Sequence, residues 1–267
     1  MVEERKIMQK LHILNGDFAL KIWQESGFSG ESLVWKETYI EGPLPLTDDL
    51  HVFRTARAEF LSHFTEVSGL GTERLYRHLQ KMDDAVLNQS GSLTLWFDSC
   101  IFDQTLLMRI LSLLTLRCDE SLAAFLYCCS GNCLTAEDFQ RGKTEKIRLT
   151  SKDFQLASRA WYAFQEKDRE KMIFLAQTED FERLPAMKKA LLRCAEEIPD
   201  SSGLNRTRRQ ILKLVAEGCG SFIEIFKGLD RFEELPFLGD TACQRHLDFL
   251  VQNGFLVREN DRYKSAE

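Results

Sequence analysis

The sequence has few of the features that mark special classes of protein. Its formal net charge is only −6, from 35 Lys and Arg against 41 Asp and Glu, so the chain as a whole lacks the basic excess that favours binding to phosphate backbones. No apolar run approaches the roughly 18 uncharged residues of a membrane-spanning helix. The first ten residues mix acidic and basic side chains instead of forming a secretory signal, which predicts a cytoplasmic protein.

Familiar catalytic and metal-binding motifs are also missing. The eight cysteines form no C-x-x-C pair and most lie in apolar runs, as is typical of free buried thiols, so they predict no zinc site. The sequence contains no G-x-S-x-G, H-E-x-x-H or G-x-x-x-x-G-K-[ST] motif. Their absence argues, respectively, against the nucleophile elbow of an α/β-hydrolase, the zinc site of a metalloprotease and the phosphate-binding P-loop. Asn15-Gly16-Asp17 supplies one glycine where a dinucleotide site needs G-x-G-x-x-G, so that site has little support.

The first half of the chain has the pattern of an α/β domain. Short β-rich runs at 11–14, 32–35, 93–97 and 122–128 alternate with longer helical patterns, which predicts a mostly parallel sheet flanked by helices. Residues 130–149 are polar and predict a linker or exposed excursion. We therefore expect an α/β domain over 1–145 and a second unit over 146–267, in line with the roughly 150 residues of an average domain.

The second half has a helical pattern throughout. Apolar stripes at 154–164 and 187–194 predict two helices. Further on, Thr207-x-x-Gln210 and Thr241-x-x-Gln244 each open a helical pattern, with a third helix between them and a short strand at 255–257. Three short helices followed by a strand are the layout of a winged helix, so we expect a winged-helix-like module at the end of the chain.

Polar side chains cluster where the predicted strands end. In an open parallel sheet, ligands bind outside the carboxyl ends of the strands, next to helix N-termini. Four acids at these ends are candidate catalytic residues: Asp17, Glu37, Asp98 and Asp103. Neighbouring candidates for ligand binding are His12, Asn15, Gly16, Trp35, Gly42 and Gln104. If the acids converge, they can hold a hard cation such as Mg²⁺ beside a phosphate, or one carboxyl can tune another as a general acid or base.

The same residues have structural interpretations. Asp17 and Asp98 are suited to capping the helices that follow them, and Asp103 favours the positive end of its helix. His12 and Trp35 are expected in the core of the sheet. Glu37 has no evident capping role, which makes it the least explained acid of the set.

The C-terminal module suggests a different kind of partner. Its only basic cluster is Arg206, Arg208 and Arg209, with Arg245 on the last predicted helix as a further candidate for contacting nucleic acid. That helix also bears Asp240 and Asp248, which would repel phosphates. A solvated face and a protein-docking role are the alternatives.

Three sequence blocks resemble a known bacterial family. They are Leu11-His12-Ile13-Leu14-Asn15-Gly16-Asp17, then Leu33-Val34-Trp35-Lys36-Glu37 with Glu41-Gly42-Pro43-Leu44, then Trp96-Phe97-Asp98 with Phe102-Asp103-Gln104. In this order they resemble the domain of unknown function 1835. The segment from Trp161 through Arg193, Pro199, Gly203-Leu204 and Arg206-Thr207 to the last strand is similar to its usual companion, domain of unknown function 3658. The resemblance implies a cytoplasmic bacterial protein and assigns no activity.

Two hypotheses follow. In the first, the N-terminal domain binds a small phosphorylated or nucleotide-like ligand at the strand ends, with Mg²⁺ and phosphoester chemistry as further expectations. In the second, the chain is a non-enzymatic regulator whose winged-helix-like module contacts a protein or DNA. The sequence leaves open the identity of the ligand, whether a reaction is catalysed, and the oligomeric state.

Overall fold

The main sheet has five strands and is almost entirely parallel. The computed structural model describes residues 9–64, 71–117, 122–131, 133–234 and 238–266. The strands are β1 (Lys10–Leu14), β2 (Glu31–Val34), β3 (Ser92–Asp98), β4 (Ala123–Cys129) and β5 (Ile147–Arg148). Their order is β2-β1-β3-β4-β5, and only the pairing of β4 with β5 is antiparallel. The predicted α/β fold is confirmed.

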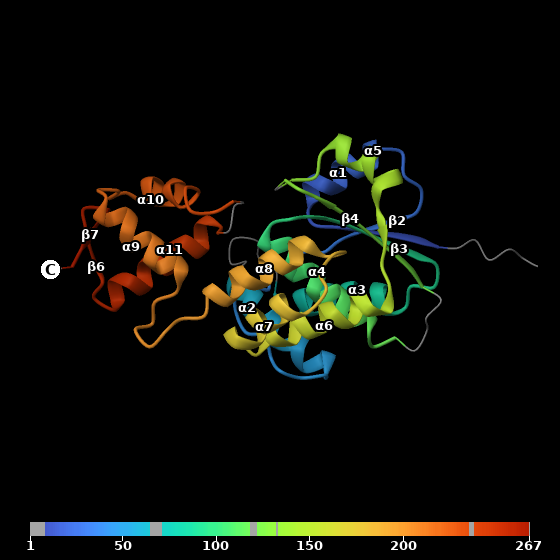
Figure 1. The fold of residues 1–267 in the computed structure, drawn as a ribbon, viewed down its shortest axis with the longest axis horizontal. Helices are drawn as coiled ribbons and strands as arrows, with labels where there is room; N and C mark the ends of the chain where they lie inside the picture. The colour runs from blue at the N-terminus through green and yellow to red at the C-terminus, as the bar shows by residue number, and fades with distance from the viewer. Residues whose placement is uncertain (1–8, 65–70, 118–121, 132, 235–237, 267) are drawn as a thin grey trace, which may run out of the picture.

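Helices cover both faces of this sheet (Figure 1). On one face lie α1 (Asp17–Glu25) and α5 (Ala136–Glu145). The other face carries the remaining helices up to residue 196, which are α2 (Leu50–Phe64), α3 (Thr72–Leu87), α4 (Ile101–Leu114), α6 (Ser151–Gln165), α7 (Arg169–Thr178) and α8 (Pro185–Glu196). Among the described residues, no helix is both long and apolar enough to cross a membrane.

Alternating side chains of the strands supply two separate cores. Along β3, Leu93, Leu95 and Phe97 point into the large core shared with α2, α3, α4, α6, α7 and α8. Trp96 points the other way, into a smaller core that includes Trp23 of α1. Successive side chains of a strand point to opposite faces of the sheet, and here both faces are buried. The strands are therefore apolar at nearly every position, which is why they could be recognised in the sequence.

The polar segment 130–149 was predicted to be a linker or an exposed excursion; most of its described residues are exposed, but the segment is structured and is not a linker. It contains α5 and β5, and α5 begins at a capping box in which Thr135 and Asp138 bond each other's backbone amides. Phe139 of α5 is fully buried, and a Cβ on Gly142 would lie 2.3 Å from the ring of Trp96. A short, mostly polar helix therefore packs closely on the sheet through two positions.

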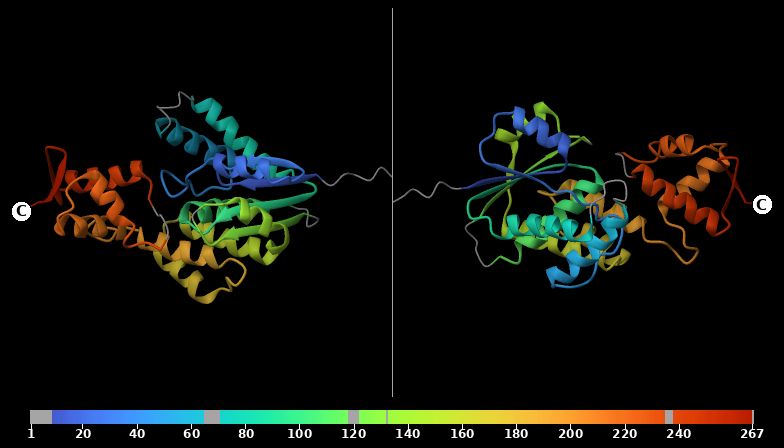
Figure 2. Two further views of the ribbon diagram at one scale, coloured as in Figure 1. Left: turned by 90° about the horizontal axis from the view of Figure 1, so that it is seen from above. Right: turned by 180° about the vertical axis from the view of Figure 1, so that it is seen from behind.

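The end of the chain forms a unit with its own core. It consists of α9 (Arg206–Ala216), α10 (Phe222–Leu229), α11 (Asp240–Gln252) and an antiparallel hairpin of β6 (Leu256–Glu259) and β7 (Arg262–Ser265). Asn260 and Asp261 form the turn with positive φ angles of 47° and 58°, as a two-residue hairpin requires. The views in Figure 2 show this module beside the α/β unit. Its identification as a winged helix stays a prediction, as does the domain boundary near 145.

Candidate functional site

The candidate site lies where β1 and β3 end side by side. After β1 the chain forms β2 on one side of β1, and after β3 it forms β4 on the opposite side of β3. The direction in which strands are added to the sheet therefore reverses between β1 and β3. Asn15 follows β1 and Asp98 is the last residue of β3. A switch point of this kind is where open α/β sheets bind ligands, since the following helices begin there on opposite faces.

Three of the predicted side chains meet at this point. The Nδ2 of Asn15 donates to Asp103 Oδ2 at 2.7 Å and lies 3.3 Å from Asp98 Oδ2. Single ligand atoms of Asp98, Cys100 and Asp103 all lie within 4.8 Å of one another. The two aspartates are only 2% and 5% exposed, and Asn15 is half-buried. The structure thus brings Asn15, Asp98 and Asp103 together.

Helix capping explains part of this arrangement. Asp98 Oδ1 accepts from the backbone amide of Cys100 at 2.9 Å, and Asp103 Oδ2 accepts from that of Asp98 at 2.7 Å. Asp138 and Asp153 hold the same third helical position in α5 and α6, and each bonds a threonine hydroxyl and amide. Asp103 instead has Cys100 at the N-cap and a second carboxyl as its neighbour.

The electrostatics of the pair go beyond capping. Burial, and then the charge of Asp98, raise the pKa of Asp103 to about 8. Burial also raises the pKa of Asp98, although its bonds to Cys100 oppose the shift. Neither carboxyl forms an ion pair with a Lys, Arg or His among the described residues. Near neutral pH the pair therefore retains a proton, which a hard divalent cation can replace.

Gln104 and Gly16 lie next to this cluster. Gln104 is 1% exposed, and its Nε2 donates to the carbonyl oxygen of Asp98 at 2.6 Å and contacts Cys128 Sγ at 3.5 Å. Gly16 is the N-cap of α1, which has no side-chain cap, and a Cβ at Gly16 would touch nothing within 4 Å. The sequence therefore placed both residues beside the site.

Glu37 does not join the other acids. Its side chain is fully buried in an ion pair with Arg57, whose Nη2 donates to Glu37 Oε1 at 2.6 Å. Trp35 is also fully buried and donates to Tyr39 Oη at 3.3 Å. The positive φ of Gly42, 79°, and the ring of Phe60 against it indicate a structural turn. The expectation that Glu37 lines an open hollow is not met, because a cation from α2 closes over it.

Asp17 and His12 have other partners as well. Asp17 is 70% exposed in its side chain and bonds Lys36 Nζ at 2.8 Å. His12 is buried among aromatic rings, where its Nδ1 accepts from Trp96 Nε1 at 3.0 Å and its Nε2 faces the carbonyl of Ser29. Burial lowers the pKa of His12, so it is neutral and serves as a core histidine.

The arginines considered for nucleic acid all have partners within the chain. Arg206 pairs with Glu196 and Glu233, Arg208 donates to the carbonyl of Gly203 and stacks on Phe249, Arg209 pairs with Asp200, and Arg245 pairs with Glu41. Each positive charge is thus offset locally or covers an aromatic ring. The nucleic-acid alternative stays a prediction that no observed contact favours.

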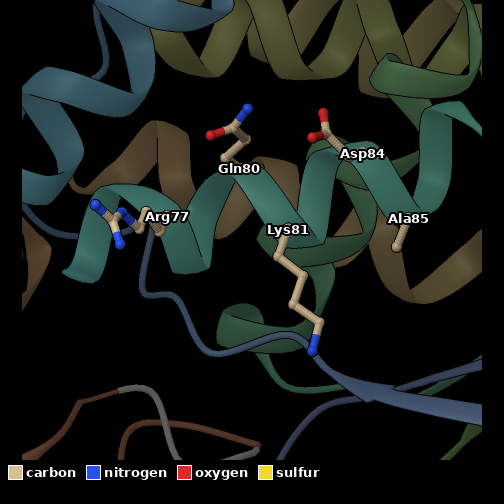
Figure 3. A pocket seen from close by; sticks show the side chains of 5 residues that line it. All are labelled: Arg77, Gln80, Lys81, Asp84 and Ala85. Carbon is tan, nitrogen blue, oxygen red and sulfur yellow. The ribbon is translucent and has the colours of Figure 1, made fainter. Parts of the chain in front are cut away.

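A separate surface hollow lies on α3. Its lining side chains are Arg77, Gln80, Lys81, Asp84 and Ala85, all from that one helix. Figure 3 shows Gln80 and Asp84 pointing to one side of the helix and Lys81 to the other. The hollow thus gathers no converging set of groups, and none of its residues was a predicted site residue.

Comparisons with known proteins leave the identity open. No family model matches the sequence, and no curated protein matches it. Among solved structures, the chain is similar to the Walker-type ATPase PABY2304 of Pyrococcus abyssi, with 16% sequence identity over 82% of this chain and 75% of that one. The TM-score of 0.22 is too low for this likeness to carry an argument.

Proposed function

We propose that the protein binds a small phosphorylated or nucleotide-like ligand at the carboxyl edge of the sheet, with Mg²⁺ held by Asp98 and Asp103. The observation that carries this proposal is the meeting of Asn15, Asp98 and Asp103 at the switch point. Mg²⁺ is typically bound by one or two carboxylates and completes its shell with water and substrate phosphate. The buried pair offers two such carboxylates, and no ammonium or guanidinium group of the described residues is paired with them.

The cation would also give the site a reaction. Held by Asp98 and Asp103, Mg²⁺ would supply charge neutralisation for the hydrolysis of a phosphoester, in which water adds to phosphorus, the bond from phosphorus to the leaving oxygen breaks, and that oxygen takes the proton that the water gives up. Asn15 holds the two carboxyls together, and the uncapped N-terminus of α1 beside Gly16 favours an anion. Membership of the domain of unknown function 1835 and 3658 families remains part of this proposal and adds no residue role to it.

Binding of Mn²⁺, used as a paramagnetic substitute for Mg²⁺, tests the proposal. We expect one Mn²⁺ bound by the wild-type protein in phosphate-free buffer, measured by electron paramagnetic resonance. Affinity should rise from pH 6 to pH 8.5, because the cation must displace the proton that the raised pKa of Asp103 retains. Exchange of both carboxyls, Asp98→Asn with Asp103→Asn, should abolish binding.

Asp153→Asn is the matched control, since Asp153 is likewise a buried aspartate in the first turn of a helix. It loses a capping carboxylate, at a cost of about 1 kcal/mol, but no metal ligand. Retention of Mn²⁺ binding in the double Asp98 and Asp103 variant would refute the proposal, and so would an equal loss in Asp153→Asn.

A further inference from the structure

The C-terminal module and the α/β unit bury separate apolar cores. Ile198, two residues after α8, packs against the large core, whereas Leu204, two residues before α9, packs against the core of the module. Leu238 is the one apolar side chain among the described residues that packs against both cores. The chain therefore passes from one packed body to the other between residues 198 and 204, and Figure 1 shows the module as a separate body at one end of the molecule.

The turn that precedes α9 belongs to the module. The carboxylate of Asp200 pairs with Arg209 of α9. Gly203 lies against α11, because a Cβ at this position would be 3.2 Å from the ring of Phe249. Residues 198–199, between α8 and this turn, are therefore the part of the connection about which the module can rotate as a whole.

Ion pairs connect the module to the α/β unit. Those that cross between the two are Arg193–Glu233, Glu196–Arg206, Lys189–Glu234 and Glu41–Arg245. The pair of Arg193 with Glu233 is the most buried, with side chains 11% and 10% exposed and hydrogen bonds of 2.8 and 3.0 Å from Nη2 and Nε. An interface that depends on polar contacts permits movement of one unit relative to the other, which a large apolar interface would prevent.

A cavity of about 830 Å³ lies between the two units, next to the candidate site. Cys128 lines it at the edge of the sheet, Ala186 lines it from α8, and Phe232 lines it from the segment after α10. Closely packed interiors contain few voids larger than a water molecule, so the facing surfaces of the two units are not complementary here. Because the module supplies one wall, its rotation away from α8 would open the cavity to solvent.

Each charge of the most buried ion pair has a second partner on its own side. Arg193 Nη1 donates to Glu197 Oε1 at 2.5 Å, at the end of α8. Glu233 accepts from Gln210 at 3.0 Å and pairs with Arg206 at 3.5 Å, and both of these partners belong to α9. Rotation of the module would thus leave neither charge without a partner, which avoids the large cost of stranding a buried ion.

We propose that the C-terminal module is a hinged lid on this cavity, turning about residues 198–199 and held closed by the ion pairs to α8 and to Glu41. Glu197 accepts from the hydroxyl of Thr207 at 2.7 Å directly beside the hinge, so this contact persists as the lid turns. The closed position depends most on Glu233, because this residue forms the buried pair with Arg193. Opening of the lid controls access to the cavity and does not depend on the ligand or the metal proposed for the edge of the sheet.

Small-angle X-ray scattering of the full chain, extrapolated to zero protein concentration, measures the opening. Salt screens exposed ion pairs, so the radius of gyration of the wild-type protein should rise between about 0.05 M and about 1 M NaCl. Glu233→Gln removes one charge of the buried pair and should give the larger radius already at low salt. A radius of gyration that stays the same in both experiments would overturn the proposal.

Alkylation by N-ethylmaleimide, located by mass spectrometry, distinguishes opening of the lid from unfolding. Cys128 lines the cavity, whereas Cys194 of α8 is 3% exposed and lies in the large core. In Glu233→Gln, Cys128 should react about tenfold faster than in the wild type or more, because the loss of a charge-assisted hydrogen bond shifts the equilibrium toward the open state by at least that factor. Cys194 should stay unreactive. An equal gain at both thiols would indicate loss of the large core and contradict the lid.

Glu179→Gln is the matched control, because Glu179 accepts two hydrogen bonds from Arg159, at 2.6 and 2.9 Å, entirely within the α/β unit. It should change the reaction of Cys128 by less than about twofold. Arg206→Gln removes the pair with Glu196 at the surface and should also speed the reaction, which keeps the test available if Glu233→Gln does not fold by circular dichroism. An acceleration in Glu179→Gln equal to that in the two lid variants would refute the proposal.

Discussion

The ends of β2 and β3 present buried acids at the same edge of the sheet, yet the two are neutralised in opposite ways. Glu37 after β2 meets a guanidinium group, and both partners are fully buried. Asp98 and Asp103 after β3 meet each other and the amide of Asn15. The difference indicates which acid is structural: a carboxylate with a buried cation is complete, while two carboxyls without one require a proton or a metal ion.

Arg57, the partner of Glu37, also holds the loop that follows β2. Arg57 donates to the carbonyl oxygens of Thr38, Glu41 and Pro43 at 2.9, 2.6 and 3.1 Å, in addition to both carboxylate oxygens of Glu37. One guanidinium group thus satisfies the backbone of the segment after β2. This geometry uses the planar, five-donor shape of arginine, which lysine does not have.

The largest expected effect comes from breaking that pair. Arg57→Gln leaves Glu37 charged, buried and without its cation, which should lower the free energy of unfolding by about 3–5 kcal/mol in urea titrations. The double variant Glu37→Leu with Arg57→Met should be less damaging than the single one, because it removes the stranded charge. A cost below about 1 kcal/mol for Arg57→Gln would place Glu37 back among the candidate functional acids.

The free energy of unfolding, measured over a series of pH values, tests the acids after β3. The pKa of Asp103 is raised from 3.8 to about 8 in the folded state, so the native protein holds a proton that the unfolded chain releases. The stability from this group is fully present below pH 3.8 and is lost as pH rises through about 8, with a slope of at most about 1.4 kcal/mol per pH unit. Asp103→Asn should lack this decline in urea titrations.

Asp138→Asn serves as the contrasting variant in that series. Hydrogen bonds from Thr135 and Tyr127 hold the pKa of Asp138 below its ordinary value, although burial opposes the shift. Its contribution is present above the unfolded pKa and is lost as pH falls. A wild-type protein whose stability relative to Asp103→Asn stays flat from pH 4 to pH 8 would show that Asp103 is ionised throughout.

The smallest effect is expected at the exposed acid. Asp17→Asn removes an ion pair to Lys36 whose side chains are 70% and 52% exposed, so the free energy of unfolding should change by no more than about 0.5 kcal/mol. Mn²⁺ binding should be unchanged. Weaker Mn²⁺ binding in Asp17→Asn, with thermal unfolding unaltered, would show that Asp17 contributes to the metal site, as the sequence predicted.

Much of the fold could be predicted from hydrophobic periodicity. The strands of the parallel sheet were found because they are buried on both faces, as Leu95 and Trp96 of β3 illustrate. The helix α5 was missed because its polar composition resembles a loop and only Phe139 and Gly142 are buried in it. The capping pattern Thr135-x-x-Asp138 was the signal for its start.

The part of the site that depends on strand order could be predicted from the sequence. Asn15 follows β1, Asp98 ends β3 and Asp103 lies in the first turn of the next helix; since β1 and β3 pair directly, the approach of these residues follows from the topology. Glu37 was misplaced because its partner lies on a helix whose position depends on tertiary packing. Arg57 falls on the apolar stripe of that helix, between Phe53 and Leu61, and an arginine on a buried face is a signal that an acid lies opposite.

The cavity between the sheet edge, α8 and the segment after α10 is lined by residues from both halves of the chain. Its lining runs from Ser99 to Glu234, across every candidate boundary in the sequence. A half ending at residue 145 would lose the part of the large core that α6, α7 and α8 supply, together with one side of the hollow. A mutation in the C-terminal module can therefore reshape a hollow bordered by the α/β unit while leaving every residue of that unit unchanged.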